Sequence, residues 1–313
     1  MAQAITPAAL VYTPREPRAI AHAVAALNPA ACLAGGETLL RPGASVVLDF
    51  GEELVGVIEL TAEADGATTV ELIEGEDLEE ALLVQDPFPP DHWYHQPRDI
   101  LQVNPGRQTL RNQGRRAFRF VNVIVHGPGA LRLSGARAIL EHAPVTDRGH
   151  FHCSDPLLND AWAISRRTMR LCMQGFYEDG VKRDGMLWIG DYRVEFLCAW
   201  PLFADAALAR RSLEMFAQCR HANGSLSAVA LDAGGHLYPR VSYLGDLSTH
   251  GGLHEWVLDN YCADFVSSIW EYVLYTGDTT LARELAPVTR GVLEHLARVD
   301  LVAAVPGRTF ITD

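Results

Sequence analysis

The hydrophobic period of the sequence changes near residue 144, and this change constrains the fold more than any other feature. Between residues 44 and 140, apolar and polar residues alternate in short runs such as SVVLDFG and ATTVELIEG, with Gly and Asp-Gly steps between them. A period of two is typical of antiparallel strands. From residue 155 onward, apolar residues recur at helical spacing. The sequence therefore predicts an N-terminal antiparallel β-sandwich, residues 1–145, followed by an α-helical domain, residues 146–313.

Five helical segments are expected in the second domain. Ser154 or Asp155 would cap the first, with Pro156 in its first turn, and Gly277 and Asp278 would end the fourth. Before the strands, the Ala-rich residues 16–34 indicate a short helix or an irregular segment. A Gly-rich connection, residues 223–252, is too long for a simple turn between helices. The expected helical segments are residues 156–176, 192–205, 206–222, 254–278 and 279–299.

Charge and composition exclude several classes of partner. The 313 residues carry a formal net charge of −13. Nucleic-acid-binding proteins gain affinity from clustered Lys and Arg, so no nucleic acid partner is expected. The longest apolar stretches fall short of the roughly 20 residues that span a bilayer, and the N-terminus lacks the layout of a signal peptide. We expect a cytoplasmic protein without membrane contact that binds a neutral or cationic ligand.

The six cysteines are scattered along the chain without CxxC spacing. Several lie in apolar helical contexts, where a free thiol acts as a small hydrophobic side chain. Disulfides, a metal site and a cofactor are therefore not expected.

Residues 178–191, EDGVKRDGMLWIGD, combine acidic residues with conformational freedom. Three glycines make a continuous helix through the segment improbable, so Asp179, Asp184 and Asp191 could point toward one cavity. A carboxyl group crowded by other carboxylates has a raised pKa and can act as a general acid. A solvated acidic loop or a helix N-cap cluster accounts for the same composition. The composition alone leaves these alternatives open.

The spacing of this segment resembles a known family. The array Asp179-x-x-x-Arg183-Asp184-x-x-x-Trp188-x-Gly190-Asp191 is similar to the catalytic loop of the α-L-rhamnosidases of glycoside hydrolase family 78. The resemblance extends over roughly residues 44–313 and keeps the order of elements. Its other segments are LDFGEELVGVIEL (48–60), GRRAFRFVNVIVHG (114–127), FHCSDPLLNDAW (151–162) and IWEYVLYTGD (269–278).

The resemblance implies a role for each matched residue. Asp184 would be the general acid that protonates the departing glycosidic oxygen, although many members of the family have Glu at this position. Asp179 and Asp191 would bind sugar hydroxyls with Arg183 beside them, and Trp188 would form a wall of the pocket. His254, in THGGLHEW, is expected to hydrogen-bond a sugar hydroxyl from a loop, because its surroundings do not match a zinc motif.

The family also implies parts that this sequence does not match. Its (α/α)6 barrel has twelve helices, and its inverting mechanism uses a second carboxylate that activates water from the opposite face of the sugar. That base is a Glu late in the barrel, and no residue here matches it. Hydrogen bonding is a better interpretation than base catalysis for the carboxylates that could substitute: Glu195, Glu255, Asp259 and Asp264.

The expected fold is thus a β-sandwich followed by a partial (α/α)6 toroid. Half a toroid leaves apolar helix faces uncovered, so a homo-oligomer or a missing C-terminal half is expected to cover them. The expected function is hydrolysis of terminal α-L-rhamnosides with inversion, this chain supplying the general-acid half of the site. The alternatives are a noncatalytic carbohydrate-binding relative, an inactive fragment, or another reaction on the same scaffold. We expect no turnover of an aryl rhamnoside by these 313 residues alone.

Overall fold

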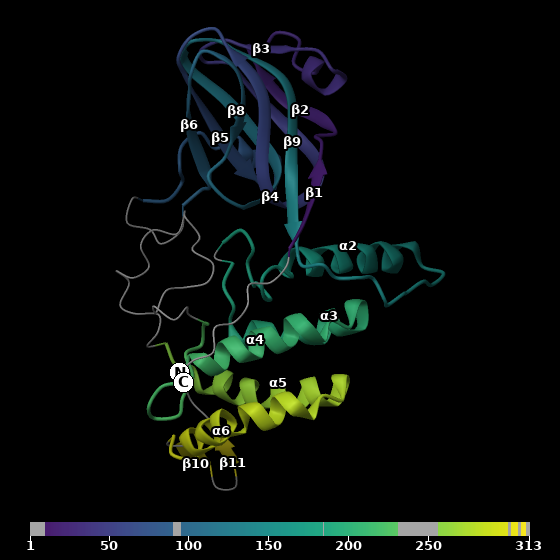
Figure 1. The fold of residues 1–313 in the computed structure, drawn as a ribbon, viewed down its shortest axis with the longest axis vertical. Helices are drawn as coiled ribbons and strands as arrows, with labels where there is room; N and C mark the ends of the chain where they lie inside the picture. Colours follow the sequence, from purple (N-terminus) through teal and green to yellow (C-terminus); the bar gives the residue numbers. More distant parts are fainter. Residues whose placement is uncertain are drawn as a thin grey trace. The chain divides into compact units, whose positions relative to one another are not determined.

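The fold is taken from a computed structural model that describes residues 10–89, 95–183, 185–230 and 256–299, together with the strands β10 (Val302–Val305) and β11 (Arg308–Phe310). The chain divides into two compact units (Figure 1). The first, the β unit, is Val11–His142, and the second, the helical unit, contains the described residues from Ala143 onward.

The β unit is one hydrogen-bonded network of nine antiparallel strands, with β1-β9-β4-β8-β5-β6 in order and β2, β3 and β7 paired to it at the side. Alternating or continuous burial along the long strands matches their apolar patterns. The strands are β1 (Val11–Arg15), β2 (Ala19–Val24), β3 (Thr38–Leu40), β4 (Ser45–Ala64), β5 (Thr68–Gly75), β6 (Arg98–Val103), β7 (Gly106–Arg111), β8 (Arg116–Pro128) and β9 (Leu131–His142).

Strand β4 connects two groups of strands. Its first part pairs with β2 up to Asp49 and with β8 up to Gly56. Its second part pairs with β9 from Gly56 onward and with β7 from Glu59 onward. The register with β8 shifts between Asp49 and Leu54, where Gly51 has a φ of +77° that favours glycine. A single strand of twenty residues therefore belongs to both groups.

The predicted antiparallel β region followed by helices is confirmed. The interpretation of residues 16–34 is wrong for its first part, because Ala19–Val24 forms β2 and pairs with β4. Only Ala31–Ala34 is helical, as a single 3-10 turn, η1. Pairing with a neighbouring strand outweighed the helix propensity of the alanines.

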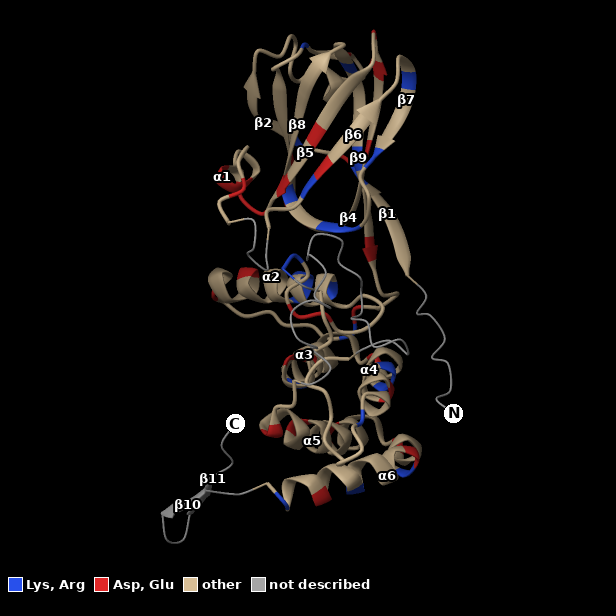
Figure 2. Cartoon of the chain, turned by 90° about the vertical axis from the view of Figure 1, so that its left-hand side faces the viewer, with Lys and Arg blue, Asp and Glu red and all other residues tan. Residues whose placement is uncertain are grey.

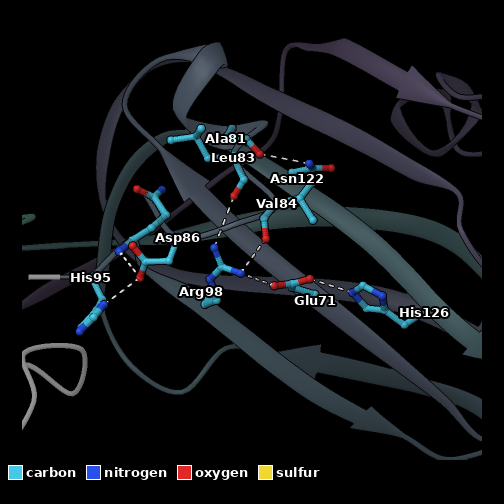
Figure 3. Close-up of polar contacts among 10 residues, drawn as sticks. Glu71, Ala81, Leu83, Val84, Asp86, His95, Arg98, Asn122 and His126 are labelled. Atoms are coloured by element: carbon cyan, nitrogen blue, oxygen red, sulfur yellow. Dashed lines mark hydrogen bonds and ion pairs between the residues drawn. The ribbon is translucent and has the colours of Figure 1, made fainter. Parts of the chain in front are cut away.

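Polar contacts hold the connection between β5 and β6 against the sheet (Figure 3). This connection contains the short helix α1 (Leu78–Ala81), whose last carbonyl accepts a 3.1 Å hydrogen bond from Asn122. Arg98 donates to the Val84 carbonyl at 2.9 Å and to Glu71 at 3.1 Å. His126 contacts the other oxygen of Glu71 at 2.7 Å.

The helical unit contains α2 (Pro156–Cys172), α3 (Ile189–Phe203), α4 (Ala206–Gln218), α5 (Asp259–Thr276) and α6 (Thr279–Leu296). Asp155 caps α2 by accepting from the Leu157 amide, Pro156 lies in its first turn, and Gly277 ends α5 in the left-handed conformation, as predicted. Helix α5 packs against α3, α4 and α6 around one apolar core that includes Tyr192, Phe216 and Phe265.

Arg210 links three carboxylates on α4, on α6 and at the residue that caps α6. It contacts Glu214 at 2.8 Å and Asp278 at 3.2 Å, and it also pairs with Glu284. Figure 2 shows such basic and acidic residues in blue and red along α4 and α6. Among the described residues, no helix is long and apolar enough to cross a membrane. A toroid of paired helices stays a prediction.

Candidate active site

A pocket of about 720 Å³ lies within the helical unit. It is bounded by the loop between α2 and α3, by the first two turns of α3 and by the first two turns of α5. Four of its lining residues are acidic and one is basic. The lining residues are Asp179, Gly180, Arg183, Gly190, Asp191, Val194, Glu195, Tyr261 and Asp264.

The loop that follows α2 is held by backbone hydrogen bonds. The Glu178 amide donates to the Cys172 carbonyl at 2.9 Å, and the Asp179 amide donates to the Met186 carbonyl at 3.1 Å. The Gly185 amide closes a turn on the Gly180 carbonyl at 2.9 Å, and Gly185 has a φ of +57°. The loop therefore reverses direction between Asp179 and Met186, which brings Asp179 to the pocket.

Asp179 and Arg183 form an ion pair on this loop, with Arg183 NH2 2.6 Å from Asp179 Oδ2. The Asp179 side chain is only 7% exposed, whereas that of Arg183 is 53% exposed. The guanidinium is therefore open to water while the carboxylate that it neutralises is covered.

Asp191 belongs to α3, which corrects the interpretation of residues 178–191 as one continuous loop. Helix α3 begins at Ile189, so Gly190 and Asp191 lie in its first turn. A Cβ at Gly190 would lie 2.4 Å from Cε1 of Tyr261, so this glycine permits close packing of α3 on α5. A carboxylate in the first turn of a helix is also stabilised by the helix dipole.

Tyr261 of α5 reaches Asp191 across the pocket. Its hydroxyl donates a 3.2 Å hydrogen bond to Asp191 Oδ2. Burial, the charge of Asp191 and this hydrogen bond raise the pKa of Tyr261 to about 12. The phenol therefore keeps its proton at neutral pH and remains a donor to the carboxylate.

Glu195 lies one turn after Asp191 and shares its face, as the spacing predicts. The residue is partly buried, but its Oε2 atom is shielded from solvent and has no hydrogen-bond partner among the described residues. Burial, followed by the charges of Asp179, Asp191 and Glu178, raises the pKa of Glu195 well above its usual value. This carboxyl therefore tends to keep its proton when its neighbours have lost theirs.

Besides Glu195, two candidates for a substitute base are described, Asp264 and Asp259, and each contacts a basic side chain. Arg193 NH1 contacts Asp264 at 2.8 Å and donates through Nε and NH2 to Glu271 at 3.0 and 2.8 Å. These pairs raise the pKa of Arg193 above its usual range. Asp259 contacts His295 at 2.7 Å. Both aspartates thus have the hydrogen-bonding roles that the sequence analysis favoured over base catalysis.

Other predicted site residues do not lie in this pocket, or are not described. Trp188 is not among the described residues that line it. Instead it precedes α3, bridges to Val229 and contacts the Trp256 ring at a centroid distance of 6.0 Å. Asp184, His254 and Glu255 lie outside the described residues.

No pattern in the sequence indicates Tyr261 as part of the site. It lies 70 residues after Asp191, on a helix whose apolar pattern predicts core packing. Only the packing of α5 against α3 brings the two side chains together. A hydrogen bond between two residues that are far apart in the sequence has no characteristic spacing, so a single sequence does not reveal it.

One other group of side chains has the composition of a metal site. Asp259, Cys262 and His295 offer ligand atoms within 4.8 Å of one another, and such an N, O and S set suits Zn²⁺. However, His295 and Asp259 already share a hydrogen bond, and burial raises the pKa of the Cys262 thiol, which favours its protonated form. The polar atoms of this group therefore have partners without a cation.

Comparisons with known proteins give the helical unit a family. Residues 146–290 match the model of the bacterial α-L-rhamnosidase six-hairpin glycosidase domain. A rhamnosidase from Klebsiella oxytoca, solved with rhamnose bound, matches 94% of this chain with a TM-score of 0.73 and 25% identity. The chain spans 58% of the length of that protein.

Two further solved structures share the fold. A family 78 rhamnosidase from a Bacillus species matches 85% of this chain and 26% of its own, with a TM-score of 0.69 and 24% identity. A Streptomyces avermitilis α-L-rhamnosidase in complex with L-rhamnose matches 94% of this chain and 25% of its own, with a TM-score of 0.64 and 18% identity. No match was found among the curated proteins.

The domain that carries the pocket is thus of the six-hairpin glycosidase class. Within that class, the model that residues 146–290 match is the bacterial α-L-rhamnosidase one, which agrees with the resemblance noted in the sequence.

Proposed function

We propose that this chain carries the general-acid half of a site that hydrolyses terminal α-L-rhamnosides with inversion. The observation that supports it most directly is the pocket of about 720 Å³ inside the family-matched domain, lined by Asp179, Asp191 and Glu195. Sugar hydroxyls donate well to carboxylates, and the relative from Klebsiella oxytoca binds rhamnose. In this proposal residues 1–145 form the β-sandwich domain and residues 146–313 form the N-terminal half of an (α/α)6 catalytic domain.

Asp184 is proposed as the general acid. In the sequence it directly follows Arg183, whose cationic group lines the pocket. A general acid must hold a proton near the operating pH, and crowding by other carboxylates is one way in which the pKa of a carboxyl group is raised. Asp179, Arg183 and Asp191 are proposed to bind the sugar, and the proposal keeps His254 and Trp188 as further sugar contacts.

The proposed acid is tested with two leaving groups in whichever form of the protein turns over, this chain or a longer one that contains it. Asp184→Asn is expected to abolish cleavage of a rhamnoside with a poor leaving group and to spare an activated aryl rhamnoside more, because only the poor leaving group needs protonation. Equal losses on both substrates would contradict the role of Asp184. NMR of the first-formed rhamnose anomer tests inversion.

The alternative is a carbohydrate-binding protein without turnover, in which the carboxylate-lined pocket holds a sugar that is not cleaved. Binding of L-rhamnose by the 313-residue chain, with no cleavage of an aryl rhamnoside by any longer form, would support it. A homo-oligomer would be detected by light scattering. The proposed location is the cytoplasm, where the reducing environment keeps the six free thiols unpaired.

A further inference from the structure

We infer that Glu195 binds the sugar as an uncharged carboxylic acid, donating a hydrogen bond to a ring hydroxyl of a neutral monosaccharide. The inference rests on the proposed function and deepens it, since it assigns the site a donor that lies outside the matched catalytic loop. It also makes Glu195 a binding residue and excludes it as the substitute base that the sequence left open.

The first support is position. Glu195 lines the pocket on the face of α3 that carries Asp191. Its Oε2 atom is shielded from solvent and lacks a partner among the described residues. A buried polar atom without a hydrogen-bond partner destabilises the folded state. A small turn of the side chain toward the pocket that Glu195 lines would bring this atom to a ligand hydroxyl, which would supply the partner that the described residues do not.

The second support is the charge of the surroundings. Arg183 neutralises Asp179, and Arg193 neutralises Asp264. Glu195 has no such cation among the described residues. Burial and the charges of Asp179, Asp191 and Glu178 therefore favour its neutral form. The titratable and charged groups around it are Tyr177, Glu178, Asp179 and Arg183 from the loop, Asp191 and Arg193 from α3, and Tyr261 and Asp264 from α5.

The third support is the balance of donors and acceptors. Asp179, Asp191 and Asp264 offer acceptors, and Tyr261 already donates to Asp191. A sugar hydroxyl both donates and accepts, and apart from the cationic Arg183 the charged side chains of the lining offer acceptors when ionised. A protonated Glu195 adds a donor without adding a cation, which suits a neutral sugar.

The test compares Glu195→Gln with Glu195→Ala in the 313-residue chain. The amide of Gln keeps the size of Glu and a donor, whereas Ala removes both. Dissociation constants for L-rhamnose are measured by calorimetry at several pH values. At pH 7 we expect Gln to bind within about threefold of the wild type and Ala at least about tenfold more weakly. Glu294→Ala, at an exposed position of α6, is the matched control and should bind as the wild type does.

The pH dependence gives a readout that a purely structural role would not move. Wild-type affinity should fall as pH rises through the pKa of Glu195, and Glu195→Gln should lack that fall. The carboxyl carbon of Glu195, assigned by its loss in the Gln variant, should titrate well above the usual range in ¹³C NMR. If Glu195→Gln binds the sugar as weakly as Glu195→Ala does, sugar binding requires the negative charge of Glu195 and the inference is wrong. Equal binding by all variants would remove Glu195 from the site.

Failure of the proposed function gives a different result. A panel of neutral monosaccharides is tested beside L-rhamnose. If the wild type binds another neutral sugar in place of L-rhamnose, and the affinities of the Gln and Ala variants follow the expected order, the inference on Glu195 stands and the rhamnoside assignment falls. If no neutral sugar in the panel binds, both fall. A normal pKa for Glu195 in NMR overturns the inference alone.

Discussion

Each unit of the molecule places a buried glutamic acid beside an aspartate–arginine pair, and the two arrangements differ in where the arginine lies. In the β unit, Glu74 lies near Asp99 and Arg116, whose side chains are 6% and 5% exposed. In the helical unit, Glu195 lies near Asp179, whose partner Arg183 is 53% exposed. Burial raises the pKa of both glutamates. We call the β-unit arrangement closed, because its arginine is buried, and the closed arrangement has a structural role. We call the helical-unit arrangement open, because its arginine is exposed and a ligand can reach it.

The largest expected effect is on the free energy of unfolding, and it differs between variants of Arg116 and Arg183. Arg116→Met leaves Asp99 buried without its cation and should lower the free energy of unfolding by about 3–5 kcal/mol. Arg183→Met also leaves a covered carboxylate, Asp179, but the lost cation is itself 53% exposed, so the loss of stability should be smaller than for Arg116→Met. Urea unfolding followed by far-UV circular dichroism measures both. Similar losses in the two variants would mean that the exposure of the arginine does not distinguish the sites.

The open arrangement also depends on the packing of α3 on α5. Gly190→Ala places a Cβ 2.4 Å from the ring of Tyr261 and should cost about 1–3 kcal/mol, because overpacking forces side chains and backbone to move. It should also disturb the Tyr261–Asp191 hydrogen bond and weaken sugar binding. Gly175→Ala is the matched control, since a Cβ there meets no atom within 4 Å. Equal stability of the two variants would count against the close packing.

The two glutamates can be compared directly through the pH dependence of stability. Each has a pKa raised from the ordinary value of 4.5, so the folded state binds the proton more tightly than the unfolded state. The stability that the proton contributes is present below pH 4.5 and is lost as pH rises through the folded-state pKa.

Glu74→Gln and Glu195→Gln should therefore each flatten the fall in stability between pH 5 and pH 8. Each slope is expected to change by up to about 1.4 kcal/mol per pH unit, the value for one proton. L-rhamnose at saturating concentration should alter the effect of the Glu195 variant only. Urea unfolding across this range, with and without the sugar, checks the difference. An equal response of both variants to the sugar would argue against Glu195 as a binding residue.

The residues whose structure was predicted and those that were missed differ in the range of their interactions. Asp155, Pro156 and Gly277 set helix ends through contacts with nearby residues, and the sequence located all three. The start of α3 at Ile189 was missed, because glycine propensity argues against a helix that packing against Tyr261 permits. Strand β2 was missed because its partner β4 is more than twenty residues away.

The same distinction holds for the site. Asp179, Arg183 and Asp191 share one short segment, so their spacing indicated a common pocket, and the described residues bring them together. Trp188 shares the segment but lies away from that lining, because the turn into α3 directs it toward Trp256. Tyr261 and Asp264 come from α5 and depend on tertiary packing that local spacing does not encode.

The smallest expected effect concerns a carboxylate whose pKa moves in the opposite direction. Asp49 in β4 accepts from Arg119 Nε at 2.9 Å and from NH2 at 3.1 Å, and these bonds lower its pKa below the ordinary value of 3.8. Its contribution to stability is therefore present above pH 3.8 and is lost as pH falls through the folded-state pKa. Because the Arg119 side chain is 41% exposed, Asp49→Asn should cost only about 0.5–1 kcal/mol at pH 7.

The free energies of unfolding of Asp49→Asn and the wild type should become more similar below pH 3.8. For Glu74→Gln and Glu195→Gln, the difference from the wild type should instead grow as pH rises. The opposite signs arise because Arg119 favours the charged form of Asp49, while burial favours the neutral forms of the two glutamates. Urea unfolding at pH 7 and pH 3 checks the sign. A difference for Asp49→Asn that stays constant between these pH values would mean that the Arg119 pair does not stabilise the folded state through charge.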